Sequence, residues 1–376
     1  MSSVARKTLW REWPRFFPAI MATAFAGVLL LTQTGLVLGI FGSASVHITQ
    51  SDSDLWVGYP DTQSVNLGHA VSNDLLFWLH AQPEIRQAEP MLWLDADWRS
   101  PRASASISVT GLNPQPDGLL FNHLLLPAIR TQLQEPGAVI VDRSDLDTLG
   151  VQAGDLAWIN QHPVHIVALV RGLRSLGGVN ILASLETTRW LSQDASSFHT
   201  STYFIATLKN PQTLPLVLQR LNQPLPGFGP HQAWSAPHFA RQSQMFWLFD
   251  TGAGMAVFFL AVVVFVVCAV ITSQSLMAVV ISSSREYATL NALGAGLTAL
   301  RWMVFEQSLW VGGLGLLCSL VFALILWGVA RWHDVPAQMT LPAGLACAAL
   351  VFLLSLVSGL FAMRGLLRAD PALLLR

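Results

Sequence analysis

Side chains that could carry out catalysis or bind a metal are few and scattered in this chain. His162 and His165 have an H-x-x-H spacing, but Pro163 argues against one helix presenting both rings, and no cysteine or carboxylate cluster completes a zinc set. No G-x-S-x-G elbow is present. We interpret these histidines as strand-surface or turn residues, and we expect no metal site, no cofactor of the chain's own and no enzyme.

Lysine is nearly absent, and this bears on ATP chemistry. The chain contains Lys7 and Lys209 as its two lysines, and neither lies in a G-x-x-x-x-G-K-[ST] loop. A P-loop needs its lysine to reach the β- and γ-phosphates. If ATP drives this protein, the ATPase is therefore another polypeptide.

Polar side chains within apolar runs are more informative, because burying them in lipid is costly. Thr32, Gln33 and Thr34 are consecutive inside one such run, and Glu306 lies a turn inside another. The three polar residues could form hydrogen bonds between helices or line a substrate path. Glu306 could pair with Arg301 or a partner chain, or could handle a proton or substrate.

Glycines in the same runs predict close helix packing. Gly35 and Gly39 form a G-x-x-x-G pattern. A later run contains Gly312, Gly313 and Gly315, which make the helix narrow there. Such glycines let helix backbones approach closely. The pattern allows packing within one bundle and packing across a dimer equally.

These residues belong to a membrane protein by composition. Apolar residues make up 52% of the chain and charged residues 11%, against about 25% charged in ordinary soluble domains. Four runs are long enough to cross a hydrocarbon core, which needs about 20 residues. We predict transmembrane helices over residues 16–41, 246–272, 303–330 and 341–363. The first run is too long for a signal peptide, so we expect an uncleaved anchor.

The distribution of Lys and Arg predicts the orientation of these helices. The loop 331–340 carries Arg331, whereas the segments on the opposite side carry Arg6, Lys7, Arg11, Arg15, Arg285, Arg301, Arg364, Arg368 and Arg376. Because positive residues favour the cytoplasmic side, we place residues 1–15, 273–302 and 364–376 in the cytoplasm. The loop 331–340 and residues 42–245 are then extracytoplasmic.

The exported segment 42–245 is predicted to be an α+β domain inserted between helices 1 and 2. Strands are expected over Ser53–Pro60, Ser104–Leu112, Ala138–Val141 and His165–Val170, and short strands around glycine turns suggest a small barrel. A helix should begin near Ser72 and another should cover Pro211–Gln223. Cys268, Cys318 and Cys347 all lie in predicted spans, so no disulfide supports this domain.

The cytoplasmic segment 273–302 is amphipathic. Read as a helix, Leu290, Leu293, Leu297 and Leu300 form one apolar stripe, with Arg285 and Glu286 near its start. Such a stripe could dock in a groove of a partner. The alternative is a solvated linker in which Arg285 only sets the topology.

The whole chain resembles the permeases of the MacB/FtsX superfamily of ABC transporters, most closely the stand-alone DevC type. The segments that carry the resemblance are residues 10–41, DSDLWVG (52–58), LDTLGVQAGDLAWINQHPVHIVALV (146–170), FARQSQMFWLFDTGAGMAVFF (239–259), SREYATLNALGAG (284–296) and RADPALLLR (368–376). MacB itself carries a fused N-terminal ATPase domain, so the likeness is to permease-type members.

The resemblance implies a permease dimer, homomeric or heteromeric, in a bacterial inner membrane. A separate cytoplasmic ATPase would bind ATP and act on this chain, and a periplasmic adaptor and outer-membrane channel would complete an export path for a lipid, glycolipid or hydrophobic compound. The expected ATPase-coupling residues are Arg285, Glu286, Tyr287, Leu290, Leu293 and Gly294. The alternative is an FtsX-like signalling subunit that activates an envelope enzyme. A net charge of −1 does not indicate a nucleic-acid partner.

Overall fold

The computed structural model describes residues 13–152, 154–176, 178–223, 227–283, 297–332, 335 and 337–368. They form two compact units. The helical unit lies within Met1–Gly39 and Met255–Arg376, and the α+β unit covers Ile40–Gly254.

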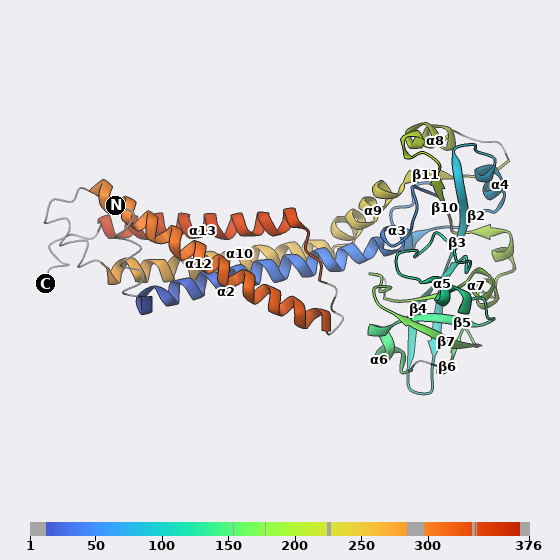
Figure 1. Cartoon of the computed structure of the whole chain (residues 1–376), viewed down its shortest axis with the longest axis horizontal. Helices are drawn as coiled ribbons and strands as arrows, with labels where there is room; N and C mark the ends of the chain where they lie inside the picture. Colours follow the sequence, from blue (N-terminus) through green and yellow to red (C-terminus); the bar gives the residue numbers. More distant parts are fainter. Residues whose placement is uncertain are drawn as a thin grey trace. The chain divides into compact units, whose positions relative to one another are not determined.

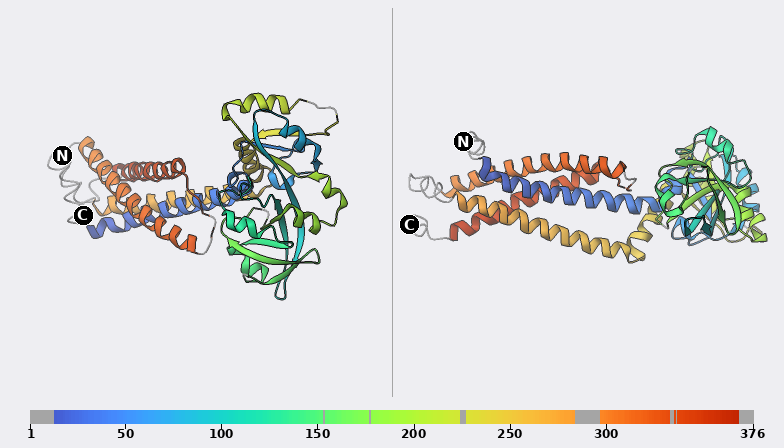
Figure 2. Two further views of the ribbon diagram at one scale, coloured as in Figure 1. Left: turned by 45° about the vertical axis from the view of Figure 1, so that its right-hand side comes forward. Right: turned by 90° about the horizontal axis from the view of Figure 1, so that it is seen from below.

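Four long apolar helices make up the helical unit, as predicted. They are α2 (Trp13–Gly42), α10 (Ala253–Ser282), α12 (Leu297–Trp332) and α13 (Leu341–Arg368). Each is long and apolar enough to cross a membrane. The helices run lengthwise beside one another (Figures 1 and 2). α10 begins at Ala253, after a π-helical turn over Phe246–Asp250, and continues to Ser282, beyond the predicted end of that span.

Small residues bring α12 close to two neighbouring helices. A Cβ atom placed on Gly315 would lie 2.7 Å from Thr23 Cβ in α2, and one on Gly312 would lie 2.9 Å from Ser355 Oγ in α13. Ser355 Oγ donates to the carbonyl of Ser308, 3.3 Å away. A Cβ on Gly313 meets no described atom within 4 Å. Close packing is therefore confirmed for Gly312 and Gly315, whereas Gly313 faces open space.

A mixed sheet organises the α+β unit. Its strands are β1 (Leu55–Gly58), β3 (Ile85–Arg99), β4 (Ser104–Leu112), β5 (Ala138–Asp142), β6 (Leu156–Ile159), β7 (His162–Val170), β8 (Val179–Ser184), β10 (Tyr203–Leu208) and β11 (Gln232–Ser235), in the order β11-β1-β10-β3-β4-β8-β5-β7-β6. A separate pair joins β2 (Val71–Ser72) to β9 (Thr200–Ser201). These positions confirm the predicted strands.

The sheet closes on itself at one end. β3 pairs with β6 through Trp98↔Ile159 and Arg99↔Trp158 in addition to its pairing with β4. The strands from β3 through β4, β8, β5 and β7 to β6 thus form the small barrel that the sequence predicted. The first part of β3, up to Met91, pairs instead with β10, so one strand belongs to the barrel and to the open part of the sheet.

Short helices cover the sheet (Figure 1). Among them are α3 (Val46–Thr49), α4 (Asp74–His80), α5 (Pro127–Gln132), α6 (Leu146–Leu149), α7 (Leu185–Leu191), α8 (Leu214–Leu221) and α9 (Ala236–Met245). α4 begins two residues after the predicted cap at Ser72, because Asn73 holds the cap position. The Ser72 hydroxyl still accepts a hydrogen bond from the Asp74 N–H, at 3.2 Å.

Apolar cores hold this unit together without disulfides. Trp98, Ile107, Val109 and Ile181 are buried inside the barrel, while a second core centres on Trp56 and its aromatic neighbours. The three cysteines are free and lie in the helical unit. The folded state of the α+β unit therefore depends on noncovalent contacts.

The two neighbouring glycines of α12 provide a matched pair of variants. In Gly315→Ala the new methyl group would overlap Thr23, so α2 and α12 must separate, at a cost of about 1–3 kcal/mol. In Gly313→Ala the methyl group meets open space, and helix propensity improves by about 1 kcal/mol. We expect thermal unfolding of the detergent-solubilised chain to occur at a lower temperature for Gly315→Ala only. Equal melting temperatures would contradict the close contact.

Candidate functional site

The polar residues predicted inside the first span lie in two different situations. Thr34 Oγ1 accepts a hydrogen bond from the Cys347 thiol of α13, at 3.3 Å, and this bond joins two helices. Thr32 Oγ1 and Gln33 Nε2 are buried and have no hydrogen-bond partner among the described residues. The choice between packing and a substrate path thus stays open for Thr32 and Gln33.

Gly35 allows two other segments to approach α2. A Cβ atom at this position would lie 3.3 Å from Trp327 Nε1 of α12. The Gly35 carbonyl accepts a hydrogen bond from the Gln338 N–H, at 3.0 Å, in the segment before α13. Gly39, the other glycine of the predicted pattern, is also buried. Gly35 therefore serves packing within this chain.

Glu306 occupies a partly exposed position in α12. Within the described part of the chain, no hydrogen bond or ion pair involves its carboxylate. The side chain of Arg301, its predicted partner, lies outside the described residues. The pairing of Glu306 with Arg301 stays a prediction.

All of the predicted coupling residues also lie outside the described residues: Arg285, Glu286, Tyr287, Leu290, Leu293 and Gly294. The structure describes the two helices that flank them. α10 ends at Ser282 and α12 begins at Leu297. At this end of the bundle Arg15 Nε donates a hydrogen bond to Ser282 Oγ, at 2.7 Å, which links α2 to α10.

A buried polar cluster lies in the α+β unit where the chain leaves α2. After α2 the chain passes through a 3₁₀ turn, Ser43–Ser45, into α3. His47 of α3 places its Nε2 atom 3.0 Å from Thr110 Oγ1 of β4 and 3.2 Å from Asn180 Nδ2 of β8. Thr110 in turn donates to Asn180 Oδ1, at 2.9 Å. We call His47, Thr110 and Asn180 the junction cluster.

Burial fixes the protonation state of His47. The ring is fully buried, and its centroid lies 5.0 Å from that of Trp93 and 5.2 Å from that of Phe121. Desolvation lowers the pKa of His47 to about 3, although the hydrogen bond with Asn180 acts in the opposite direction. His47 is therefore neutral at pH 7. Its Nδ1 atom has no described partner, whichever ring nitrogen carries the proton.

Further hydrogen bonds attach the same turn to the rest of the α+β unit. Ser45 Oγ accepts from Gln244 Nε2 of α9, at 2.8 Å. Ser51 Oγ donates to the His47 carbonyl and accepts from the Phe121 N–H, at 2.9 Å. The segment that follows α2 is thus bonded to two barrel strands, to α9 and to the loop around Phe121.

Sequence reasoning missed the junction cluster. His47 is separated from Thr110 by 63 positions and from Asn180 by 133, so no local spacing connects them. The one available signal was a histidine shortly after a long apolar run. The other histidines singled out by the sequence, His162 and His165, lie in β7, where one ring packs against Trp190 and the other pairs with Glu135.

Replacing His47 with Gln is expected to change how stability depends on pH. The native pKa is about 3, against 6.5 for the ordinary side chain, so between these values the unfolded chain binds a proton that the native ring does not. The wild type therefore loses stability relative to His47→Gln as the pH falls from 6.5 toward 3, by up to about 1.4 kcal/mol per pH unit. Denaturant titrations of both proteins across this range measure the difference.

The raised pKa of Asp145, also in the α+β unit, falls in the same range but cancels in this comparison. Desolvation raises the pKa of buried Asp145 to about 6, against the attraction of Arg174. This carboxyl group is present in both proteins. A stability difference that stayed constant with pH would show that native His47 accepts protons as readily as the unfolded chain does.

Comparison with known proteins gives a match for the C-terminal third of the chain. Residues 258–371 match the family described as FtsX-like permease C-terminal. The matched range runs from within α10 to beyond α13. No curated protein matches the chain.

Solved structures match the other unit. The extracellular domain of the noncanonic ABC-type transporter YknZ from Gram-positive bacteria is 11% identical, with a TM-score of 0.36, over 48% of this chain and 99% of that one. The periplasmic region of MacB from Actinobacillus actinomycetemcomitans is 12% identical, with a TM-score of 0.37, over 52% of this chain and 94% of that one. The similarity to an FtsX-like permease domain rests on residues 258–371.

Proposed function

We propose that this chain is the permease subunit of an ABC-type export complex. The observation that carries the proposal is the match of residues 258–371 to the FtsX-like permease family. The presence of four apolar helices supports it, and so does the lack of a P-loop in the sequence. A separate ATPase subunit supplies the energy, and this chain itself is not an enzyme.

In this proposal the ATPase subunit acts on the segment around Arg285, Glu286 and Leu293. The helices that flank this segment, α10 and α12, receive the movement, and the bond between Arg15 and Ser282 links α10 to α2. The chain then continues from α2 into the turn that holds His47. Because His47 is bonded to β4 and β8, a movement of α2 reshapes the barrel.

The remaining parts of the proposal rest on the DevC-like resemblance. The chain forms a dimer in a bacterial inner membrane with both termini in the cytoplasm. Its barrel-containing unit faces the periplasm and acts with an adaptor and an outer-membrane channel. The exported compound is a lipid, a glycolipid or another hydrophobic molecule.

The same family match favours a second candidate function. An FtsX-like subunit could relay an ATPase cycle to an envelope enzyme without transporting anything. A purified complex that contains an ATPase and a peptidoglycan hydrolase, and lacks an adaptor, would select this function over export.

Charge reversal in the coupling segment tests the link to an ATPase. We expect the tagged chain to co-purify with an ABC ATPase and to change its rate of ATP hydrolysis. Glu286→Arg or Leu293→Asp should leave membrane insertion and dimer formation intact and abolish the change in rate. Glu186→Arg, the same reversal at an exposed site of α7, is the matched control and should behave as wild type. If complexes with each of the two coupling variants hydrolyse ATP and export at the normal rate, the cytoplasmic segment 273–302 is only a linker.

A variant of the junction cluster tests transmission separately. Asn180→Leu removes the hydrogen bonds to His47 and Thr110 and leaves residues 284–296 unchanged. We expect the ATPase rate to remain coupled to the permease while export falls about tenfold or more, a loss equivalent to about 1.4 kcal/mol of coupling free energy. Thermal unfolding of the same sample checks that the barrel is folded. Export at the wild-type rate would exclude the junction cluster from transmission.

A further inference from the structure

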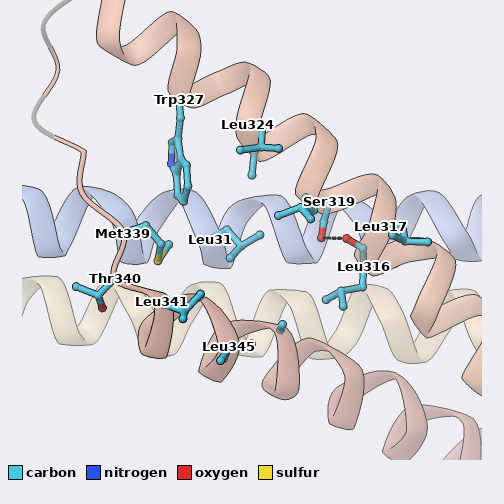
Figure 3. A pocket seen from close by; sticks show the side chains of 14 residues that line it. Leu31, Leu316, Leu317, Ser319, Leu324, Trp327, Met339, Thr340, Leu341 and Leu345 are labelled. Carbon is cyan, nitrogen blue, oxygen red and sulfur yellow. Dashed lines mark hydrogen bonds between the residues drawn. The ribbon is translucent and has the colours of Figure 1, made fainter.

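The helical unit contains an apolar cavity between α2, α12 and the start of α13. Its volume is about 560 Å³, within the range of about 300–1,000 Å³ that is usual for ligand sites. Figure 3 shows Leu324 and Trp327 of α12 on one side of it, Leu341 and Leu345 of α13 on another, and Leu31 of α2 between them. The lining is almost entirely hydrocarbon, so the occupant must be apolar where it touches this surface.

The cavity is open to the surroundings of the bundle. Leu317, Leu324 and Leu345 line it and are exposed by 61%, 56% and 63%. All three lie in helices that are long and apolar enough to span a membrane. In a bilayer the molecules next to such side chains are lipid acyl chains.

One end of the cavity carries polar groups. Trp327 reaches from α12 toward α2 at this end, where Met339 and Thr340 precede α13 (Figure 3). The Trp327 Nε1 atom is buried and has no hydrogen-bond partner among the described residues. Arg331 is exposed and lies four residues further along α12, on the same side of the helix. A buried indole N–H calls for an acceptor, and an exposed guanidinium group beside it suits a phosphate.

We propose that this cavity binds one acyl chain of a glycerophospholipid from the surrounding bilayer. The chain lies along Leu31, Leu324 and Leu345, an ester carbonyl accepts a hydrogen bond from Trp327 Nε1, and the phosphate lies near Arg331. This assignment is independent of the proposed function, because it requires neither an ATPase nor transport.

A helix from a second protein fits the cavity less well. A helix with its side chains is about 10–12 Å across and rises about 5.4 Å per turn. Two turns of such a helix therefore occupy more space than the cavity of about 560 Å³ provides. An acyl chain has no backbone N–H and C=O groups that need hydrogen-bond partners. The unpartnered polar group at this site, the Trp327 N–H, is a side-chain donor.

Photo-crosslinking of lipid to the full chain tests the proposal. The chain is reconstituted in nanodiscs of palmitoyl-oleoyl-phosphatidylglycerol that contain a phosphatidylglycerol with a diazirine in one acyl chain. Crosslinked peptides are then identified by mass spectrometry. We expect residues 316–327 and 341–348 to be labelled about fivefold more than Phe258 and Phe259 of α10, which are exposed by 64% and 70% and report general lipid contact; fivefold corresponds to about 1 kcal/mol of preference.

Two glycine variants provide a filled cavity and its control. A Cβ atom on Gly344 meets Met339 Cγ at 3.7 Å, an ordinary contact, so the side chain of Gly344→Leu can extend into the cavity. We expect this variant to reduce the labelling of the cavity peptides to that of α10. A Cβ atom on Gly328 meets no described atom within 4 Å, and Gly328 is not part of the cavity lining, so labelling should be unchanged in Gly328→Leu. Ala348→Leu fills the same cavity if Gly344→Leu does not fold.

Trp327→Phe tests the polar end, since it keeps an aromatic ring and removes the N–H. Labelling of the cavity peptides should fall about threefold, in keeping with the loss of one hydrogen bond. Equal labelling of α10 and the cavity peptides in the wild type would overturn the proposal, as would full labelling in both cavity-filling variants. Crosslinks from cavity residues to a second protein chain would also overturn it, by identifying a protein as the occupant.

Discussion

The close approach of α12 to α2 and α13 is the contact on which the helical unit depends. Lipid tails are as apolar as leucine, so the hydrophobic effect does not draw helices together inside a membrane. What remains is van der Waals contact and a few hydrogen bonds. α12 provides both where its residues are small, with Gly315 against Thr23 and Ser308 bonded to Ser355. The same helix carries larger residues further on, including Leu320, Leu324 and Trp327. The cavity lies where small residues give way to large ones.

Much of the fold follows from sequence patterns that act over short distances. A run of apolar residues as long as a bilayer is thick has few alternatives to a membrane helix, and α2, α10, α12 and α13 all occur where such runs occur. The barrel strands were visible because residues such as Ala138–Val141 are β-formers that end at turns. Their order in the sheet was not visible, since β4 pairs with β8 across a long stretch of chain. Pairing between such distant strands depends on the surfaces that the strands bury together. A short stretch of sequence does not contain this information.

The candidate site was predicted less well, for the same physical reason. Gln33, Gly35 and Glu306 stood out because a polar or very small residue is unusual in an apolar run. His47, Thr110 and Asn180 are ordinary residues in an ordinary α+β segment, and only folding brings them together. The indole nitrogen of Trp327 is likewise buried over Gly35, and no local pattern in the sequence indicates this contact. Buried polar clusters owe their properties to desolvation, and desolvation is a property of the assembled structure.

The long strand β3 has a consequence for how the α+β unit unfolds. Its first part pairs with β10 and its second part with β4 and β6, so the barrel and the open sheet share this strand. Cooperative opening units often coincide with supersecondary motifs. Here a single covalent strand runs through both, and loss of order in one part removes a neighbour from the other. We therefore expect the α+β unit to unfold in one cooperative step, although its apolar side chains are divided among several cores.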